Sequence, residues 1–227
     1  MEKKNKKMLI AGMGLLGAFV LWTVFVRFVD VRAIGPRESS VGFATLNGCV
    51  HELTGVNMSL YMITDWLGLV PIGVAFGFAV LGLTQWIKRK SLLKVDRSIL
   101  TLGGFYVIVM AVYILFETVV INYRPTLING YLEASYPSST TMLVMCVMPT
   151  AMMQLRTRIK NDLFRRCVML TITVFIAFMV IGRLVSGVHW ITDIIGGGLF
   201  SAGLVLMYYY IENTLTKSCR AKPKIKE

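Results

Sequence analysis

Hydrophobic side chains fall into six runs separated by shorter polar segments. Several of these runs reach the roughly 20 residues that a helix needs to cross a bilayer. The predicted spans are Met8–Val29, Leu60–Gln85, Ile99–Ile121, Ser139–Gln154, Cys167–Ile181 and Trp190–Ile211. The pattern therefore predicts an all-α fold: a polytopic membrane protein whose six transmembrane helices form one bundle and one domain over residues 1–227.

The basic residues support this count of spans. Most of the 24 lysines and arginines lie in four blocks that abut the ends of the apolar runs, at residues 3–7, 88–97, 156–166 and 217–226. Lys and Arg beside a span mark its cytoplasmic side, and with six spans all four blocks and both termini share that side. The blocks hold 19 of the 24 basic residues, so the positive charge behind the net +12 is concentrated at the ends of the apolar runs. We therefore predict contact with anionic lipids and no nucleic-acid partner.

The composition is that of a membrane protein, with 56% hydrophobic and 16% charged residues, against about 25% charged in soluble domains. The first run is too long for a signal-peptide core and is interpreted as a retained helix. On the side opposite the basic blocks, FATLNGCVHELTG at residues 43–55 predicts a short amphipathic helix on the membrane surface. The four cysteines show no metal-ligand spacing, and we predict neither a metal nor a cofactor.

Charged side chains within this apolar frame need a partner or a function. The stretch GRLVSGVHWITDIIGGG, residues 182–198, places Arg183, His189 and Asp193 close together. His189 and Asp193 are one helical turn apart, and an aspartate on one ring nitrogen leaves the other free as a nucleophile or base. Arg183 and Arg124 suit a phosphate through bidentate hydrogen bonds. The same residues could instead clamp helix ends or reach lipid headgroups.

A third feature precedes the fourth predicted span. In SYPSSTTM, Pro137 is followed by Ser138, Ser139 and Thr140, which occupy the first turn of the helix. Free N–H groups and hydroxyls at a helix N-terminus favour an anion, although, taken alone, simple N-capping by serine explains the pattern better. All three features map to the side opposite the basic blocks.

These motifs together resemble the type 2 phosphatidic acid phosphatase (PAP2) superfamily. That family's pattern is Lys-x6-Arg-Pro, then Pro-Ser-Gly-His, then Ser-Arg-x5-His-x3-Asp. YRP around Arg124, PSS from Pro137 and GRLVSGVHWITD from Gly182 match it in order, and the specific part of the resemblance lies within residues 117–193.

The resemblance implies a role for each matching position. His189 would attack phosphorus and form a phosphohistidine, and Asp193 would hold its ring. Water would then release phosphate. The phosphoryl oxygens would be bound by four residues: Arg124, Ser138, Ser139 and Arg183.

Three positions depart from the family pattern. The first-motif lysine is Glu117 here, the second-motif histidine that protonates the leaving group is Thr140, and Gly182 stands where serine is usual. General acid catalysis is typically worth about 10²–10⁴-fold, and a departing alkoxide needs that proton more than a departing phosphate does. We therefore expect a lipid pyrophosphate, such as a polyprenyl diphosphate, to be favoured over phosphatidic acid or phosphatidylglycerophosphate.

Two residues are candidates to replace the missing acid. Glu117 could retain a proton if it is buried, or it could pair with Arg124. His51, the other histidine, could reach the site from the first outer segment, or remain a solvated loop residue. Asp65 lies within the second span, where we expect it to face the bundle interior and pair with Arg27 or Arg124.

The sequence thus predicts a membrane lipid phosphatase with its site on the outer face of a bacterial plasma membrane. Two alternatives use the same residues. A lipid phosphotransferase would pass the phosphoryl group to another acceptor. A non-catalytic lipid-phosphate-binding protein would have lost turnover through Glu117 and Thr140.

Overall fold

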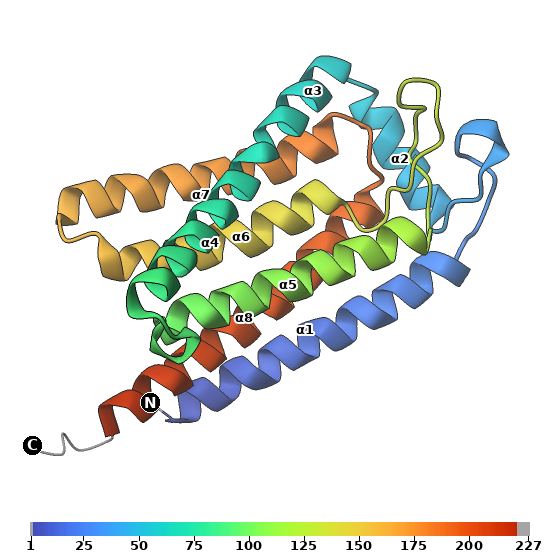
Figure 1. The fold of residues 1–227 in the computed structure, drawn as a ribbon. Helices are drawn as coiled ribbons and strands as arrows, with labels where there is room; N and C mark the ends of the chain where they lie inside the picture. The colour runs from blue at the N-terminus through green and yellow to red at the C-terminus, as the bar shows by residue number, and fades with distance from the viewer. Residues whose placement is uncertain (1, 222–227) are drawn as a thin grey trace, which may run out of the picture.

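The computed structural model describes the backbone of residues 2–221 and the side chains of residues 5–215. Long helices run side by side, and α1 begins at the same end of the bundle at which α8 ends (Figure 1). A short helix and two 3-10 turns, Pro36–Glu38 and Leu92–Lys94, lie in the connections. The α-helices are α1 (Glu2–Phe28), α2 (Ala44–Thr54), α3 (Met58–Leu67), α4 (Leu69–Arg89), α5 (Arg97–Thr118), α6 (Ser139–Arg158), α7 (Asp162–Val185) and α8 (Ile191–Ala221).

Within the part of the chain that the structure describes, five helical segments are long and apolar enough to cross a membrane, which confirms the predicted class of all-α membrane protein. They are Asn5–Phe28, Met58–Arg89, Arg97–Thr118, Asp162–Val185 and Ile191–Leu215. Helix α6, the fourth predicted span, is not among them. It lies inside the bundle against α4, α5, α7 and α8, so polar residues such as Thr141, Thr150 and Gln154 face protein rather than lipid. A crossing by α6, and with it the count of six, stays a prediction.

Polar side chains on α6 have partners within the bundle. The Thr150 hydroxyl donates to the Cys146 carbonyl oxygen (2.8 Å), and the Gln154 amide donates to the Tyr208 hydroxyl (2.6 Å). Such pairing removes the cost of burying these groups. The low hydropathy of α6 therefore reflects its central place.

The second predicted span is two helices, α3 and α4, which meet at Gly68. Pro71 explains the break because proline has no N–H to donate to the carbonyl four residues earlier, at Leu67, and its ring crowds that group. The Gly68 N–H instead donates to the carbonyl oxygens of Thr64 and Asp65, both at 3.0 Å. The break leaves Asp65 near the bend.

Helix α2 confirms the short helix predicted in residues 43–55, and it lies across the end of the bundle. The buried Asn47 amide joins it to α8 by donating to the Thr192 hydroxyl (3.0 Å) and to the Gly42 carbonyl oxygen (2.7 Å). Its place on a membrane surface stays a prediction.

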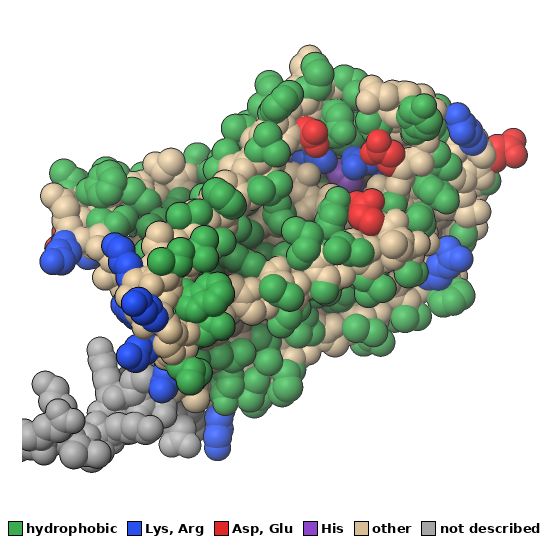
Figure 2. Space-filling model, viewed as in Figure 1, with side chains coloured by type: hydrophobic (Ala, Val, Ile, Leu, Met, Phe, Trp, Pro, Cys, Tyr) green, Lys and Arg blue, Asp and Glu red, His purple; other side chains and the backbone are tan. Residues whose placement is uncertain are grey.

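The two ends of the bundle differ in charge. Lys and Arg side chains gather at the end where α4 meets α5 and α6 meets α7, whereas acidic side chains surround a histidine and basic groups in a hollow near the other end (Figure 2). Two of the basic blocks, residues 88–97 and 156–166, form these connections. Part of the fourth block lies outside the described residues. The chain is therefore polarised along the bundle axis.

Gly187 fixes the turn between α7 and α8. Its φ is +67°, a left-handed conformation that favours glycine, and an added Cβ would lie 1.7 Å from the Gly55 carbonyl oxygen. The neighbouring Ser186 carbonyl oxygen accepts a hydrogen bond from the Asn57 N–H (2.9 Å). The turn is thus packed directly on the backbone between α2 and α3.

Replacing Gly187 with alanine should destabilise the protein strongly. A left-handed alanine costs about 1–2 kcal/mol, and the clash with Gly55 adds to that cost. Thermal unfolding in detergent should show a clearly lower Tm for Gly187→Ala. The matched control is Gly17→Ala on α1, where an added Cβ meets nothing within 4 Å. Equal Tm values for the two variants would contradict this packing.

Candidate active site

Three segments converge at the end of the bundle opposite the basic blocks: residues 119–138 between α5 and α6, the end of α7, and the start of α8. They bring Arg124 next to three residues that lie much later in the sequence, Arg183, His189 and Asp193. Each side chain is buried, with exposed fractions of 8%, 1%, 3% and 0% respectively.

The His189 imidazole lies between two guanidinium groups. Its Nε2 is 3.0 Å from Nη1 of Arg124 and 3.5 Å from Nη2 of Arg183. A guanidinium has only donors, so Nε2 must be the acceptor. The neutral ring therefore carries its hydrogen on Nδ1 and presents a lone pair at Nε2.

Asp193 faces the other ring nitrogen. Its Oδ2 lies 3.6 Å from His189 Nδ1, slightly beyond hydrogen-bond distance. The same oxygen accepts the Trp190 N–H (2.9 Å), which caps the start of α8. The Trp190 indole donates to the Tyr123 carbonyl oxygen (2.7 Å), next to Arg124. Contacts at the beginning of α8 therefore fix the Asp193 carboxylate, the His189 imidazole and the segment that carries Arg124 relative to one another.

The surroundings of His189 keep its ring uncharged. Burial lowers the pKa of the imidazole well below its ordinary value, and the nearby charges of Arg124 and Arg183 lower it further. A hydrogen bond with the Ser135 backbone opposes these effects. At neutral pH the ring is thus neutral, and its Nε2 lone pair faces the two guanidinium groups.

Arg124 is held by a hairpin. Its N–H donates to the Glu133 carbonyl oxygen (3.0 Å), and its Nε lies 3.1 Å from the Glu133 carboxylate. The hairpin turns at Asn129 and Gly130, both with positive φ, and isolated bridges join Ile128 to Tyr131 and Tyr123 to Ala134. Glu133 was missed by sequence reasoning, although the Asn-Gly pair is a recognised hairpin signal. The carboxylate beside Arg124 is Glu133, and not Glu117.

Residues of α3 position the Arg183 side chain. Its Nη1 lies 3.5 Å from the Asp65 carboxylate and donates to the Thr64 hydroxyl (3.4 Å), and its Cζ lies 5.0 Å from the centre of the Tyr61 ring. The partner of Asp65 is therefore Arg183, and the expected pairing with Arg27 or Arg124 was wrong. The expected place in the bundle interior was also wrong, since the Asp65 side chain is 56% exposed. The sequence pattern did not show that α3 packs on α7.

The start of α6 borders the same region. Ser138 is fully buried; its hydroxyl accepts weakly from the Thr141 N–H (3.5 Å), and its own N–H donates to the Asp193 carbonyl oxygen (3.1 Å). Ser139 and Thr140 are half-buried. They line a cavity of about 350 Å³ together with Asp65.

The two proposed replacement acids lie at the edge of the site. Glu117, near the end of α5, lines a small separate cavity with Ser135, Pro137 and Ser139. The His51 ring packs 5.4 Å from the Trp190 ring, centre to centre. Burial lowers the pKa of His51, which leaves it neutral and poorly suited to donate a proton.

The side chains of the site have the chemistry that suits an anion. Among the side chains that the structure describes, His, Cys, Asp and Glu form no group of three or more that could hold a metal ion. Two guanidiniums supply paired donors in a buried setting, which is the arrangement that recognises phosphate.

The model of the PAP2 superfamily matches residues 69–217, and the chain therefore belongs to the PAP2 superfamily. Its apolar helices make it a multi-pass membrane protein. No curated protein matches the chain. A similar solved structure is the crystal structure of a transmembrane PAP2-type phosphatidylglycerolphosphate phosphatase from Bacillus subtilis, with 18% identity, a TM-score of 0.54, and coverage of 95% of this chain and 98% of that one. At this identity the likeness shows a shared fold alone.

The protonation state of His189 can be measured directly because the chain has only two histidines. In ¹⁵N-histidine NMR of the His51→Gln variant, we expect a neutral ring with its hydrogen on Nδ1 at pH 6, where an ordinary histidine is mostly charged. The lowered pKa means that the ring charges only as the pH falls further. Adding Arg124→Gln should raise the pKa, since one cation is lost. A charged ring at pH 6 would contradict the geometry.

Proposed function

We propose that the protein is a membrane lipid phosphatase that cleaves a lipid phosphate or pyrophosphate through a phosphohistidine on His189. One observation carries the proposal: a neutral, buried imidazole presents its Nε2 lone pair between two guanidiniums. A phosphoryl group held by both arginines would lie directly at the nucleophile.

The first step forms a bond between Nε2 and phosphorus. Arg124 and Arg183 bind the phosphoryl oxygens and neutralise the charge that spreads over them. The attack is in line with the leaving oxygen. The ring gains positive charge as it reacts, and Asp193 beside Nδ1 stabilises that charge. Ser138 and Ser139 add donors at the start of α6.

The second step restores the enzyme. Water attacks the phosphohistidine, the bond between phosphorus and Nε2 breaks, and inorganic phosphate leaves. The imidazole returns to its neutral form between the arginines. A phosphotransferase would use the same intermediate with another acceptor in place of water.

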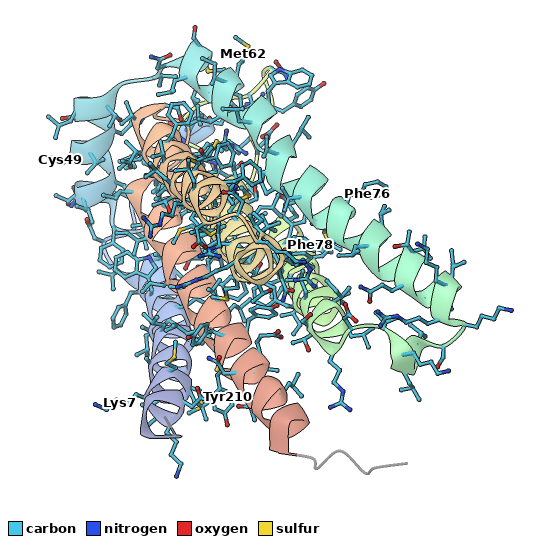
Figure 3. The ribbon with its side chains drawn as sticks, turned by 90° about the vertical axis from the view of Figure 1, so that its left-hand side faces the viewer. Lys7, Cys49, Met62, Phe76, Phe78 and Tyr210 are labelled. Atoms are coloured by element: carbon cyan, nitrogen blue, oxygen red, sulfur yellow. The ribbon has the colours of Figure 1, made fainter. Side chains whose placement is uncertain are left out.

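An apolar cleft between α4 and α5 suits the lipid tail. It measures about 710 Å³ and is lined by side chains such as Phe76, Phe78, Trp86 and Leu102. Ile72 lines both this cleft and the cavity at Thr140, so the two adjoin. Figure 3 shows α4 leaning away from the bundle, with Phe78 directed toward the bundle and Phe76 away from it. A tail in the cleft would place the phosphate at the site.

The charge polarity supports an orientation. Basic blocks at one end mark the cytoplasmic side, which puts the site on the outer face of the membrane. With α6 counted as a crossing, both termini are cytoplasmic. We propose that this membrane is a bacterial plasma membrane.

Thr140 supports a lipid diphosphate as the favoured substrate. A hydroxyl is a poor acid near neutral pH, and phosphate leaves from a diphosphate with less need of a proton than an alkoxide leaving from a monoester. A polyprenyl diphosphate meets this condition and fits an apolar cleft.

Phosphate release in detergent tests this function. The unmodified protein should release phosphate from a polyprenyl diphosphate faster than from phosphatidic acid. His189→Ala should lose more than about 10³-fold on both, as expected for a missing nucleophile. His51→Gln, which removes the chain's other histidine, is the matched control and should retain turnover. Faster release from phosphatidic acid would contradict the substrate preference. No release from either lipid would favour a binding protein.

A further inference from the structure

Asp65 and His189 lie at opposite ends of one guanidinium. Nη2 of Arg183 is 3.5 Å from His189 Nε2, and Nη1 of Arg183 is 3.5 Å from the Asp65 carboxylate. A phosphoryl group bound by Arg183 would therefore have the nucleophile on one side and this carboxyl on another. In-line attack drives the leaving oxygen away from the nucleophile, out of the space between the arginines.

A cavity of about 350 Å³ is lined by Asp65, the ion-pair partner of Arg183, and offers space for the leaving group. Asp65 and Thr140 both line it, and its other walls include Leu69, Ile72 and Leu143. Thr140 is the position at which the family pattern has histidine. The carboxyl of Asp65 is the strongest acid type among the lining residues, since the others offer only hydroxyl or phenol groups or none.

Gly182 allows Asp65 to reach this place. An added Cβ at Gly182 would lie 2.9 Å from the Thr64 methyl group, so α3 packs closely on α7 only because residue 182 has no side chain. Thr64 is fully buried and its hydroxyl accepts from Arg183. The next residue, Asp65, is thereby held against the guanidinium. Two departures from the family pattern, at residues 140 and 182, thus coincide with one carboxyl in the leaving-group cavity.

We propose that Asp65 protonates the leaving group, in the role that a histidine at position 140 would otherwise fill. The inference rests on the proposed phosphatase function and names a catalytic residue for it. It also predicts that the slower hydrolysis of monoesters depends on Asp65.

The proton that Asp65 donates can come from the substrate itself. A phosphate monoester has its second ionisation near pH 6, so a fraction arrives as the monoanion. The phosphate oxygens displace the Asp65 carboxylate from the Arg183 guanidinium. The proton of the phosphate monoanion then passes to the Asp65 carboxylate, because two adjacent anions repel and share a proton. Nε2 then bonds to phosphorus, the phosphorus–oxygen bond breaks, and Asp65 gives the proton to the departing alkoxide.

The second half of the cycle returns the proton. The Asp65 carboxylate accepts a proton from the water that attacks the phosphohistidine. A phosphorus–oxygen bond forms, the bond to Nε2 breaks, and phosphate leaves. Asp65 releases its proton with the product and pairs again with Arg183.

The test varies the leaving group while keeping the phosphoryl group. Phosphatidic acid loses an alkoxide that needs a proton, whereas nitrophenyl phosphate loses a stable phenolate that does not. Asp65→Asn should lower turnover of phosphatidic acid by about 10²–10⁴-fold, and its effect on nitrophenyl phosphate should be at least about tenfold smaller. Turnover of nitrophenyl phosphate also reports that the variant is folded. Adding Thr140→His to Asp65→Asn should restore part of the lost turnover.

Two other variants separate the outcomes. Glu117→Gln removes the rival acid, and Glu52→Gln on α2 is the matched control for loss of a carboxylate at this end of the molecule. Equal losses on both esters in Asp65→Asn, or no loss, would overturn the role of Asp65, as would a selective loss in Glu117→Gln alone. His189→Ala should abolish turnover of both esters regardless of Asp65. Absence of turnover in the unmodified protein would overturn the phosphatase function itself.

Discussion

The site depends on the balance of charge around one imidazole. Arg124 and Arg183 bring two positive charges against His189 in a region almost closed to water. Buried cations are costly unless they are paired, and here Glu133 pairs with one arginine and Asp65 with the other. Burial, together with these charges, keeps the imidazole neutral, and the carboxylates keep the arginines in place. A bound phosphoryl group would take over the donors that these pairs now use.

The fold holds this arrangement through contacts at helix ends. A hairpin after α5 positions Arg124, the packing of α3 on α7 positions Arg183, and the first turn of α8 positions Asp193. Gly187 locks the turn that carries His189 onto the backbone before α3. The long helices supply a rigid frame. Arg124 and His189 lie on the connections between helices, as is common for binding and catalytic residues, whereas Arg183 and Asp193 lie in the last turn of α7 and the first turn of α8.

The sequence predicted the parts of the molecule that depend on local pattern. Apolar run lengths located the helices, and motif spacing selected Arg124, Arg183, His189 and Asp193, which the structure brings together. The break at Gly68 required the effect of Pro71 to be recognised. The low hydropathy of α6 follows from its contacts with four neighbouring helices, and no single segment reveals its neighbours.

The ion pairs show where local pattern ends. The pair between Glu133 and Arg124 could have been predicted from the sequence, because an Asn-Gly turn folds Glu133 back on Arg124. The pairing of Asp65 with Arg183 depends on how closely two helices distant in sequence approach, and that distance is set by a missing side chain at Gly182. Such packing is a property of the assembled bundle. The close packing of α3 on α7 makes Arg183 the partner of Asp65, in place of the predicted Arg27 or Arg124. It also brings the Asp65 carboxyl into the cavity beside Thr140.

The central claim is that His189 carries the phosphoryl group. Rapid mixing with a polyprenyl diphosphate labelled in its terminal phosphate, followed by an alkaline quench and peptide mapping, tests it most directly. We expect an alkali-stable, acid-labile label on the peptide that contains His189, and this label should pass to inorganic phosphate when the reaction continues. Phosphate release without labelled protein, or label on another residue, would contradict it.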